Sequence, residues 1–218
     1  MRTVIAGGHG QIALRLERLL SARGDTAVGL IRNPAQADDL RQAGGEPLVL
    51  DLESATVDSV AAALAGADAA VFAAGAGAGS GADRKQTVDR DAAVLLADAA
   101  ERAGVRRFLI VSSMGADAQS SYEEPGFAAY LRAKGAADDA IRARTSLDWT
   151  ILRPGALTDD PGTGQVRLSA DHTGRGSVPR DDVAAVLVAL LDAPGTAGLT
   201  LELISGDTGI AAAVQQIT

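Results

Sequence analysis

The chain has 218 residues, 47% of them hydrophobic but only 3% aromatic, which suits a single domain whose core is built from Ala, Val, Leu and Ile. Its net charge of −8 at pH 7 argues against nucleic acid as a partner, because binding to a phosphate backbone depends on clustered Lys and Arg. Zero cysteines and only two histidines exclude disulfides and His/Cys metal clusters, so we expect no bound metal.

Short apolar runs alternate with helical patterns along the chain. The runs predict strands at residues 3–6, 26–31, 47–50, 69–73, 107–111, 149–152 and 199–204. Apolar spacing predicts helices at residues 12–23, 34–43, 55–64, 83–103, 127–144 and 181–192. This alternation predicts one α/β domain, with a mostly parallel sheet, helices on both faces and ligands above the carboxyl ends of the strands.

One long segment lacks such a pattern. Residues 156–180 are rich in Gly, Thr, Asp and Pro, and we expect them to be irregular and to form a small substrate or lid segment. Within it, residues 161–176 are expected to close over the pocket when substrate binds.

The stretch from Gly7 to Ala13 joins the first predicted strand to the first predicted helix. At Gly7 and Gly10 a tight turn lets backbone N–H groups approach a phosphate, and the helix N-terminus adds unpaired donors and a partial positive charge. The spacing is G-x-x-G-x-x-A, which departs from G-x-G-x-x-G but keeps a small residue, Ala13, where the helix packs on the sheet. The turn predicts a dinucleotide site. His9 either donates to the phosphate or faces solvent, and the sequence leaves both open.

Arg32 follows the second predicted strand, where a residue that contacts the ribose is expected. A guanidinium there pairs with a 2′-phosphate, whereas a carboxylate would repel it. We therefore expect NADP as the cofactor, with NADPH preferred over NADH. The small residues 74–81 form either a flexible linker or a loop whose backbone approaches the cofactor, and their place after the fourth strand favours the loop.

Tyr130 and Lys134 are spaced i and i+4, which puts both side chains on one face of a helix. A neighbouring ammonium favours the phenolate and so makes a tyrosine a better proton shuttle near neutral pH. By themselves the two are better explained as an ordinary residue of an amphipathic helix and a solvated charge. Ser112 and Ser113, at the end of the preceding strand, can bring a hydroxyl to the same crevice and complete a candidate triad.

With these features the chain resembles the short-chain dehydrogenase/reductase superfamily, specifically its atypical NAD(P)H-binding members of epimerase/dehydratase type, which have a doubly wound Rossmann fold. The resemblance covers nearly the whole chain. The motifs that carry it are the glycine turn, Asp51 with Leu52, Ala73 to Gly75, Val111 to Ser113, Tyr130 with Lys134, Leu152 to Gly155, and Ser177 to Ala184.

The resemblance implies a nicotinamide cofactor over the strand ends. In this family pattern Tyr130 is the acid/base, and Lys134 binds the nicotinamide ribose and assists Tyr130. Ser113 polarises the substrate, with Ser112 as the competing choice. Asp51 and Leu52 would contact adenine, residues 73–75 would line its ribose, and residues 154–157 would border the nicotinamide. The full set of expected cofactor contacts is Gly7, His9, Gly10, Gln11, Ile12, Arg32, Asp51, Leu52, Ala73, Ala74, Gly75, Lys134, Pro154, Gly155, Ala156 and Leu157.

Three functions remain open at this point. The first is an NAD(P)H-dependent oxidoreductase, or a sugar-nucleotide-type epimerase/dehydratase, that transfers hydride on a small carbonyl or hydroxyl substrate. The second is a non-enzymatic NADP(H)-sensing regulator. The third is a flavin or quinone reductase in which Tyr130 is incidental. We expect a cytoplasmic monomer or homodimer with a small-molecule substrate and no membrane partner, because no apolar run approaches the ~20 residues of a membrane span.

Overall fold

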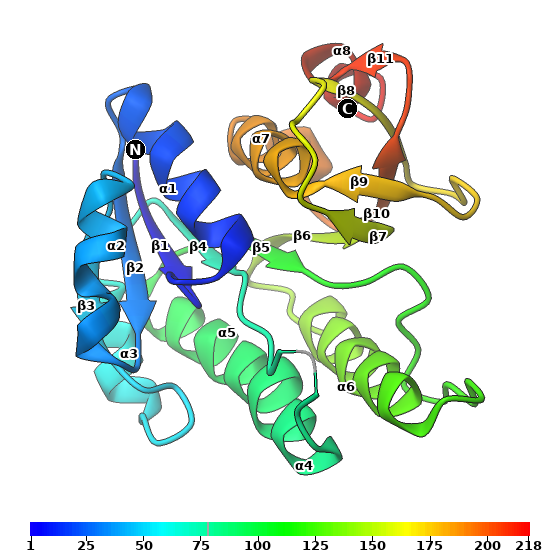
Figure 1. Ribbon diagram of the computed structural model, residues 1–218. Helices are drawn as coiled ribbons and strands as arrows, with labels where there is room; N and C mark the ends of the chain where they lie inside the picture. Colours follow the sequence, from blue (N-terminus) through cyan, green and yellow to red (C-terminus); the bar gives the residue numbers. More distant parts are fainter. Residues whose placement is uncertain (78) are drawn as a thin grey trace.

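The computed structural model describes residues 1–77 and 79–218, and in it a nine-stranded sheet lies between two layers of helices (Figure 1). The strand order is β11-β8-β10-β6-β5-β4-β1-β2-β3. The parallel strands are β1 (Arg2–Ala6), β2 (Thr26–Ile31), β3 (Glu46–Val49), β4 (Ala69–Phe72), β5 (Arg107–Val111), β6 (Asp148–Pro154) and β10 (Leu199–Ser205). This architecture confirms the predicted α/β fold with a mostly parallel sheet.

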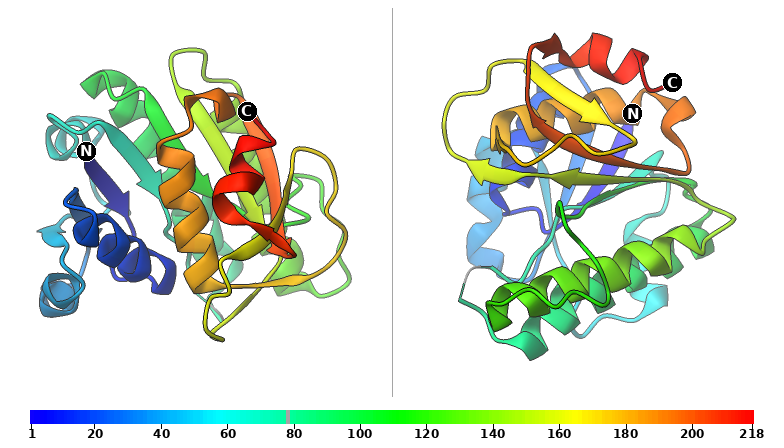
Figure 2. Two further views of the ribbon diagram at one scale, coloured as in Figure 1. Left: turned by 90° about the horizontal axis from the view of Figure 1, so that it is seen from above. Right: turned by 90° about the vertical axis from the view of Figure 1, so that its right-hand side faces the viewer.

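Helices cover both faces of the sheet. One face carries α1 (Gln11–Ala22), α7 (Arg180–Leu191) and α8 (Ile210–Gln215), and the other carries α3 (Val57–Ala63), α5 (Ala92–Ala103) and α6 (Pro125–Arg142). Figure 2 shows α7 and α8 on the side of the sheet opposite α6. The remaining helical elements are η1 (Pro34–Gln36), α2 (Ala37–Gln42), α4 (Ala82–Lys85), the π-helical turn η2 (Gln86–Asp91) and η3 (Pro194–Thr196).

Alternating apolar residues along the inner strands build the two cores. In β1, Ile5 packs in the core with α1 and α7, while Val4 and Ala6 pack in the core with α3, α5 and α6. All three side chains are fully buried. Because both faces of a parallel strand are covered, its sequence reads as a continuous apolar run. The local sequence therefore indicates each inner strand clearly.

Residues 156–180 differ from the prediction. They contain β7 (Ala156–Thr158), β8 (Gln165–Ser169) and β9 (Ser177–Pro179), so the expectation of an irregular segment is wrong. In β8 only Val166 and Leu168 are buried, and it pairs antiparallel with β10 and with β11 (Thr208–Gly209), while β7 pairs with β9. An edge strand with two apolar residues gives a weak pattern. The closure of residues 161–176 over the pocket stays a prediction.

The carboxyl ends of the parallel strands meet at one edge of the sheet. The loops after β1, β2, β4 and β5 all begin there, which gathers residues from the first two-thirds of the chain. Among the described helices, none has the length and apolar character to cross a membrane.

Candidate functional site

The glycine turn fits tightly between neighbouring strands. Gly7 has φ +82°, and a Cβ atom there would lie 2.6 Å from the Cα atom of Ala74, so only glycine fits. The Gly10 N–H donates to the Gly7 carbonyl at 2.8 Å, which closes the turn directly before α1. Gly10 supplies no side-chain cap to α1, so the amides of the first helical turn face the crevice ready for an anion. This arrangement fits the pyrophosphate of a dinucleotide.

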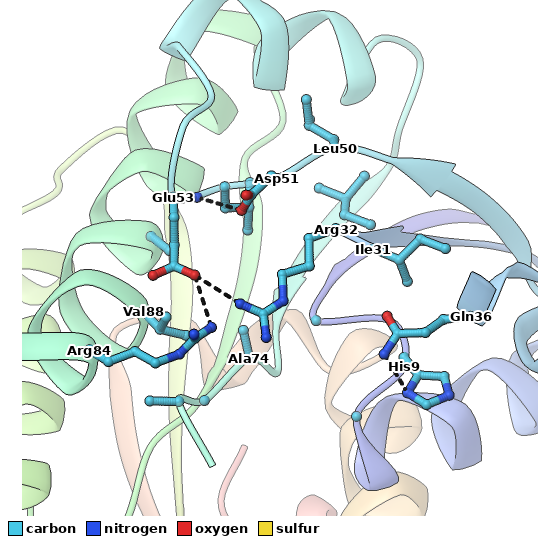
Figure 3. A pocket seen from close by; sticks show the side chains of 17 residues that line it. His9, Ile31, Arg32, Gln36, Leu50, Asp51, Glu53, Ala74, Arg84 and Val88 are labelled. Atoms are coloured by element: carbon cyan, nitrogen blue, oxygen red, sulfur yellow. Dashed lines mark hydrogen bonds and ion pairs between the residues drawn. The ribbon is translucent and has the colours of Figure 1, made fainter. Parts of the chain in front are cut away.

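A first cavity of about 250 Å³ opens beside this turn (Figure 3). Its apolar walls come from the ends of β2 and β3 and from the start of α5. Of the expected cofactor contacts, it brings together Gly7, His9, Gly10, Arg32, Asp51, Leu52, Ala74 and Gly75. Residues from four loops thus enclose a space beside the phosphate turn, as an adenosine site requires.

Two arginines share one carboxylate in the first cavity. Arg32 Nη1 lies 3.1 Å from Glu53 Oε2, and Arg84 Nη2 lies 2.9 Å from the same oxygen. The Thr87 hydroxyl donates to the other Glu53 oxygen at 2.9 Å. The sequence predicted Arg32 but missed Arg84 and Glu53. The local pattern could not reveal them, since Glu53 lies in the loop after β3 and Arg84 lies in α4, both far along the chain from Arg32.

His9 is held on both sides of its ring. Its Nε2 lies 2.7 Å from Asp39 Oδ2, and the Gln36 side-chain amide lies 3.0 Å from its Nδ1. His9 therefore lines the cavity as part of a polar cluster rather than pointing into open solvent. Both of its partners come from the segment that follows β2.

A second, larger cavity of about 820 Å³ adjoins the first. The two share Ala74, Gly75 and Ala76, so they form one continuous crevice over the strand ends. Of the small residues 74–81, Ala78 lies outside the described residues. The predicted site residues that line the second cavity are Gln11, Ile12, Ala73, Ala74, Gly75, Ser112, Tyr130, Lys134 and Leu157.

Lys134 is buried and fully engaged. Its Nζ lies 3.2 Å from Asp89 Oδ1 and donates to the carbonyls of Val111 at 3.1 Å and Ala74 at 3.3 Å. Asp89 is 1% exposed, and its other oxygen accepts from the Ala76 N–H at 3.2 Å. The Lys134–Asp89 pair therefore fixes the loop after β4 against α6. The sequence missed Asp89, which lies in the π-helical turn, a feature common at functional sites.

The two candidate serines have different surroundings. Ser112 is buried, lines the second cavity and donates to Asp138 Oδ2 at 2.9 Å. That oxygen also accepts from Arg153, at 2.9 Å and 2.8 Å. Burial raises the pKa of the Asp138 carboxyl, against the opposing effect of Arg153. Ser113, the preferred residue in the sequence analysis, donates to the Met114 carbonyl at 3.2 Å and is not among the lining residues.

Residues 154–157 reach the crevice only at Leu157. The Pro154 carbonyl accepts from Met114, and the Gly155 N–H donates to Leu203. The Ala156 N–H donates to Gly176. Because these backbone groups are bound within the sheets, the expected contacts from Pro154, Gly155 and Ala156 are not brought to either cavity.

The second cavity also contains residues that the sequence analysis missed. Lys85 lines it with its Nζ 5.8 Å from the centroid of the Tyr130 ring, and Phe127 stacks on that ring at 5.9 Å. Arg180 closes one side and is bound to Asp159 at 2.8 Å. Only Phe127 lies near Tyr130 in the sequence, so no local pattern connected Lys85 or Arg180 with this cavity.

Comparison with known proteins agrees with this architecture. The family model described as NAD(P)H-binding matches residues 7–194. The chain is 37% identical over 218 residues to the uncharacterized sugar epimerase YhfK of Bacillus subtilis, covering 100% of both chains.

The chain is also similar to solved structures over nearly its whole length. A Bacillus halodurans protein described as a candidate NAD-dependent epimerase/dehydratase is 38% identical, with a TM-score of 0.91 and 99% of each chain covered. The Escherichia coli anaerobilin reductase ChuY is 28% identical, with a TM-score of 0.80, covering 95% of this chain and 98% of its own. The chain therefore belongs to the NAD(P)H-binding family with an epimerase/dehydratase-like Rossmann fold, and this family match supports a nicotinamide cofactor.

Proposed function

We propose that this protein is an NADPH-dependent oxidoreductase that transfers hydride to a small substrate bound in the second cavity. The observation that carries this proposal is the continuity of the two cavities through residues 74–76. One end of the crevice has the phosphate turn, and the other has a phenol and a buried ammonium. A bound dinucleotide would thus reach from the first cavity to Tyr130.

Each part of the crevice has a physical role in this proposal. The glycine turn and the amides of α1 bind the pyrophosphate, and Arg32 and Arg84 bind the 2′-phosphate in place of Glu53. The cofactor supplies the hydride. Tyr130 donates the proton that the substrate oxygen gains as the adjacent carbon is reduced. Lys134 and Asp89 hold the loop after β4 in position. Ser112, the serine that lines the cavity, is the better candidate to orient the substrate.

A quinone or other conjugated acceptor is the second candidate substrate. Tyr122 and Phe127 pack edge to face at 4.9 Å and are 51% and 39% exposed. Phe127 also stacks on Tyr130 at the cavity wall. In that version the acceptor takes hydride without needing the Tyr130 proton, so the two versions differ in how much turnover depends on the phenol.

Deuterium transfer tests the proposal directly. NADPH carrying deuterium at the reactive carbon is incubated with a panel of aldehydes, ketones and quinones, and the products are analysed by mass spectrometry. We expect deuterium on the reduced carbon of an aldehyde or ketone, or oxidation of NADPH with a quinone. If the protein binds NADPH tightly but oxidises it with none of the panel, the oxidoreductase proposal is rejected and the NADP(H)-sensing alternative gains support.

A further inference from the structure

The two lysines of the chain occupy one cavity. Eighteen of the 20 basic residues are arginine, and the two exceptions are Lys85 and Lys134. Lys85 is 9% exposed and Lys134 is 3% exposed, and both line the second cavity. An ammonium is strongly hydrated, and its burial is unfavourable unless another group compensates the charge. Both lysines therefore need partners.

Lys134 has its partner, Asp89, at 3.2 Å. Lys85 has none: within residues 1–77 and 79–218 its ammonium makes no hydrogen bond or ion pair, and it lies over the face of the Tyr130 ring. Arg180 is likewise neutralised by Asp159.

One carboxylate of the cavity needs separate consideration. Glu124 lines the cavity, but it accepts hydrogen bonds from the N–H groups of Gly126 and Phe127 and so caps α6. No ion pair joins Glu124 to Lys85 in the part of the chain that the structure describes. A cation–π contact offsets only part of the desolvation of an ammonium. Lys85 is thus a largely buried side chain whose positive charge faces the cavity, where an incoming group can neutralise it.

The aromatic residues are also unevenly placed. The chain has six, and Phe72 and Phe108 are fully buried between the sheet and its helices. Three of the other four, Tyr122, Phe127 and Tyr130, form one aromatic cluster beside Lys85, in which Phe127 stacks on Tyr130 and meets Tyr122 edge to face. In this cluster Tyr122 and Phe127 remain exposed. Phe127 lines the cavity and Tyr122 extends the aromatic cluster from its rim, and exposed aromatic groups gathered in this way indicate a binding surface for a flat ligand.

We propose that the second cavity binds a flat, conjugated substrate that carries a carboxylate or phosphate group. Lys85 binds the anionic group, and the rings of Phe127 and Tyr122 cover the conjugated part. This inference rests on the proposed function, because the substrate in question is the hydride acceptor. It adds a recognition residue, Lys85, which neither the fold nor the cofactor requires.

Three naphthalene probes test the two features separately. 2-Naphthoate is flat and anionic, 2-naphthamide is flat and neutral, and decahydro-2-naphthoate is anionic but not flat. Each is titrated calorimetrically into the full-length protein, both with and without saturating NADP⁺. We expect 2-naphthoate to bind roughly 10- to 100-fold more tightly than 2-naphthamide, since one charge-assisted hydrogen bond changes affinity by that factor. We also expect it to bind more tightly than decahydro-2-naphthoate, which has no flat face to pack on the aromatic rings. Equal affinities for naphthoate and naphthamide would overturn the proposal.

Variants of Lys85 assign the anion contact. Lys85→Gln keeps most of the side-chain length without the charge, and it should lower the naphthoate affinity to that of naphthamide while leaving naphthamide and NADP⁺ binding unchanged. Lys85→Arg is the matched control and should retain most of the preference for the anion. If Lys85→Gln weakens both aromatic probes equally, the residue acts only by shaping the cavity, and the proposal fails.

Isotope labelling gives a readout that does not depend on turnover. With ¹³Cε-lysine incorporated, the protein has two labelled side chains, and Lys85→Arg assigns them. Adding 2-naphthoate should shift the Lys85 signal and leave the Lys134 signal nearly unchanged; the reverse would contradict the assignment. If the protein binds 2-naphthoate but does not bind NADP⁺, only the proposed function is rejected. Failure of the proposed function and failure of the anion-binding proposal are therefore distinguishable.

Discussion

The two cavities handle positive charge in different ways. In the first, the side chains of Arg32 and Arg84 are 54% and 39% exposed and share Glu53. In the second, the side chains of Lys85 and Lys134 are largely buried, and among the residues that the structure describes only Lys134 of the two has a carboxylate beside it. Exposed guanidiniums exchange one anionic partner for another at low free-energy cost. A largely buried ammonium instead stays in one position and favours binding of an anionic group that neutralises it. The first cavity is thus suited to binding an exchangeable phosphate, and the second to selecting one substrate over another.

The largest expected effect tests whether chemistry belongs to the second cavity. Tyr130→Phe removes the phenol oxygen but keeps the ring that contacts Phe127 and Lys85. Turnover of an aldehyde or ketone should fall about 10²–10⁴-fold, because proton transfer is lost, while the NADPH Kd stays the same. Steady-state kinetics measures the turnover, and calorimetry measures the Kd for NADPH. Full turnover on a carbonyl substrate would favour the quinone-type acceptor, for which the phenol is dispensable.

The next prediction tests the fixed pair in the second cavity. Lys134→Met leaves Asp89 buried without its cation and should reduce the free energy of unfolding by about 3–5 kcal/mol in urea titrations. The double variant Lys134→Met with Asp89→Leu removes both charges and should recover much of that loss. As a control, Arg41→Met breaks the exposed pair with Asp38 and should change stability by less than about 1 kcal/mol. No recovery in the double variant would show that the pair is not electrostatically coupled.

A third prediction concerns the pH dependence of stability and rests on Glu17, a buried carboxyl in α1. Glu17 is fully buried against Gly8, Gly29 and Gly45, and burial raises its pKa from 4.5 to about 8. Because the folded pKa is higher than the unfolded one, the stabilisation is complete below pH 4.5 and is lost as pH rises toward 8. Each pKa unit corresponds to about 1.4 kcal/mol, so the free energy of unfolding should decrease by roughly 1–3 kcal/mol between pH 5 and pH 7.

Glu17→Gln removes this titration and should flatten the decrease over the same pH range. Thermal or urea unfolding at several pH values provides the measurement. A slope that persists unchanged in Glu17→Gln would assign the pH dependence to other groups.

The smallest expected effect concerns cofactor choice in the first cavity. Arg32→Ala should weaken NADPH about tenfold and leave NADH nearly unchanged, since only NADPH has the 2′-phosphate. Glu53→Gln should act in the opposite direction, because it removes the carboxylate that competes for Arg32 and Arg84. Titration with both cofactors measures each effect. Equal affinities of the wild-type protein for NADPH and NADH would reject the expected preference.

The parts of the site that the sequence predicted are those set by local geometry. The glycine turn, Arg32 at the end of a strand, and Tyr130 with Lys134 on one helix face each depend on a few consecutive residues. Lys85 and Asp89 escaped prediction because α4 and the π-helical turn replace the regular helix expected over residues 83–103. An irregular turn changes which side chains share a face, and 3.6-residue periodicity cannot anticipate it.

The number of residues in the π-helical turn determines the direction in which the Lys85 side chain points relative to α5. Lys85 lies directly before residues 86–91, and α5 directly after them is anchored in the core. Each residue of a helix adds about 100° of rotation. Deleting one residue of the turn, so that it becomes an ordinary α-helix, would therefore swing Lys85 about a quarter of a turn around the helix axis relative to α5. Insertions or deletions at this place would therefore move Lys85 at the ligand end of the crevice and Arg84 at the cofactor end together, while the sheet stays in place.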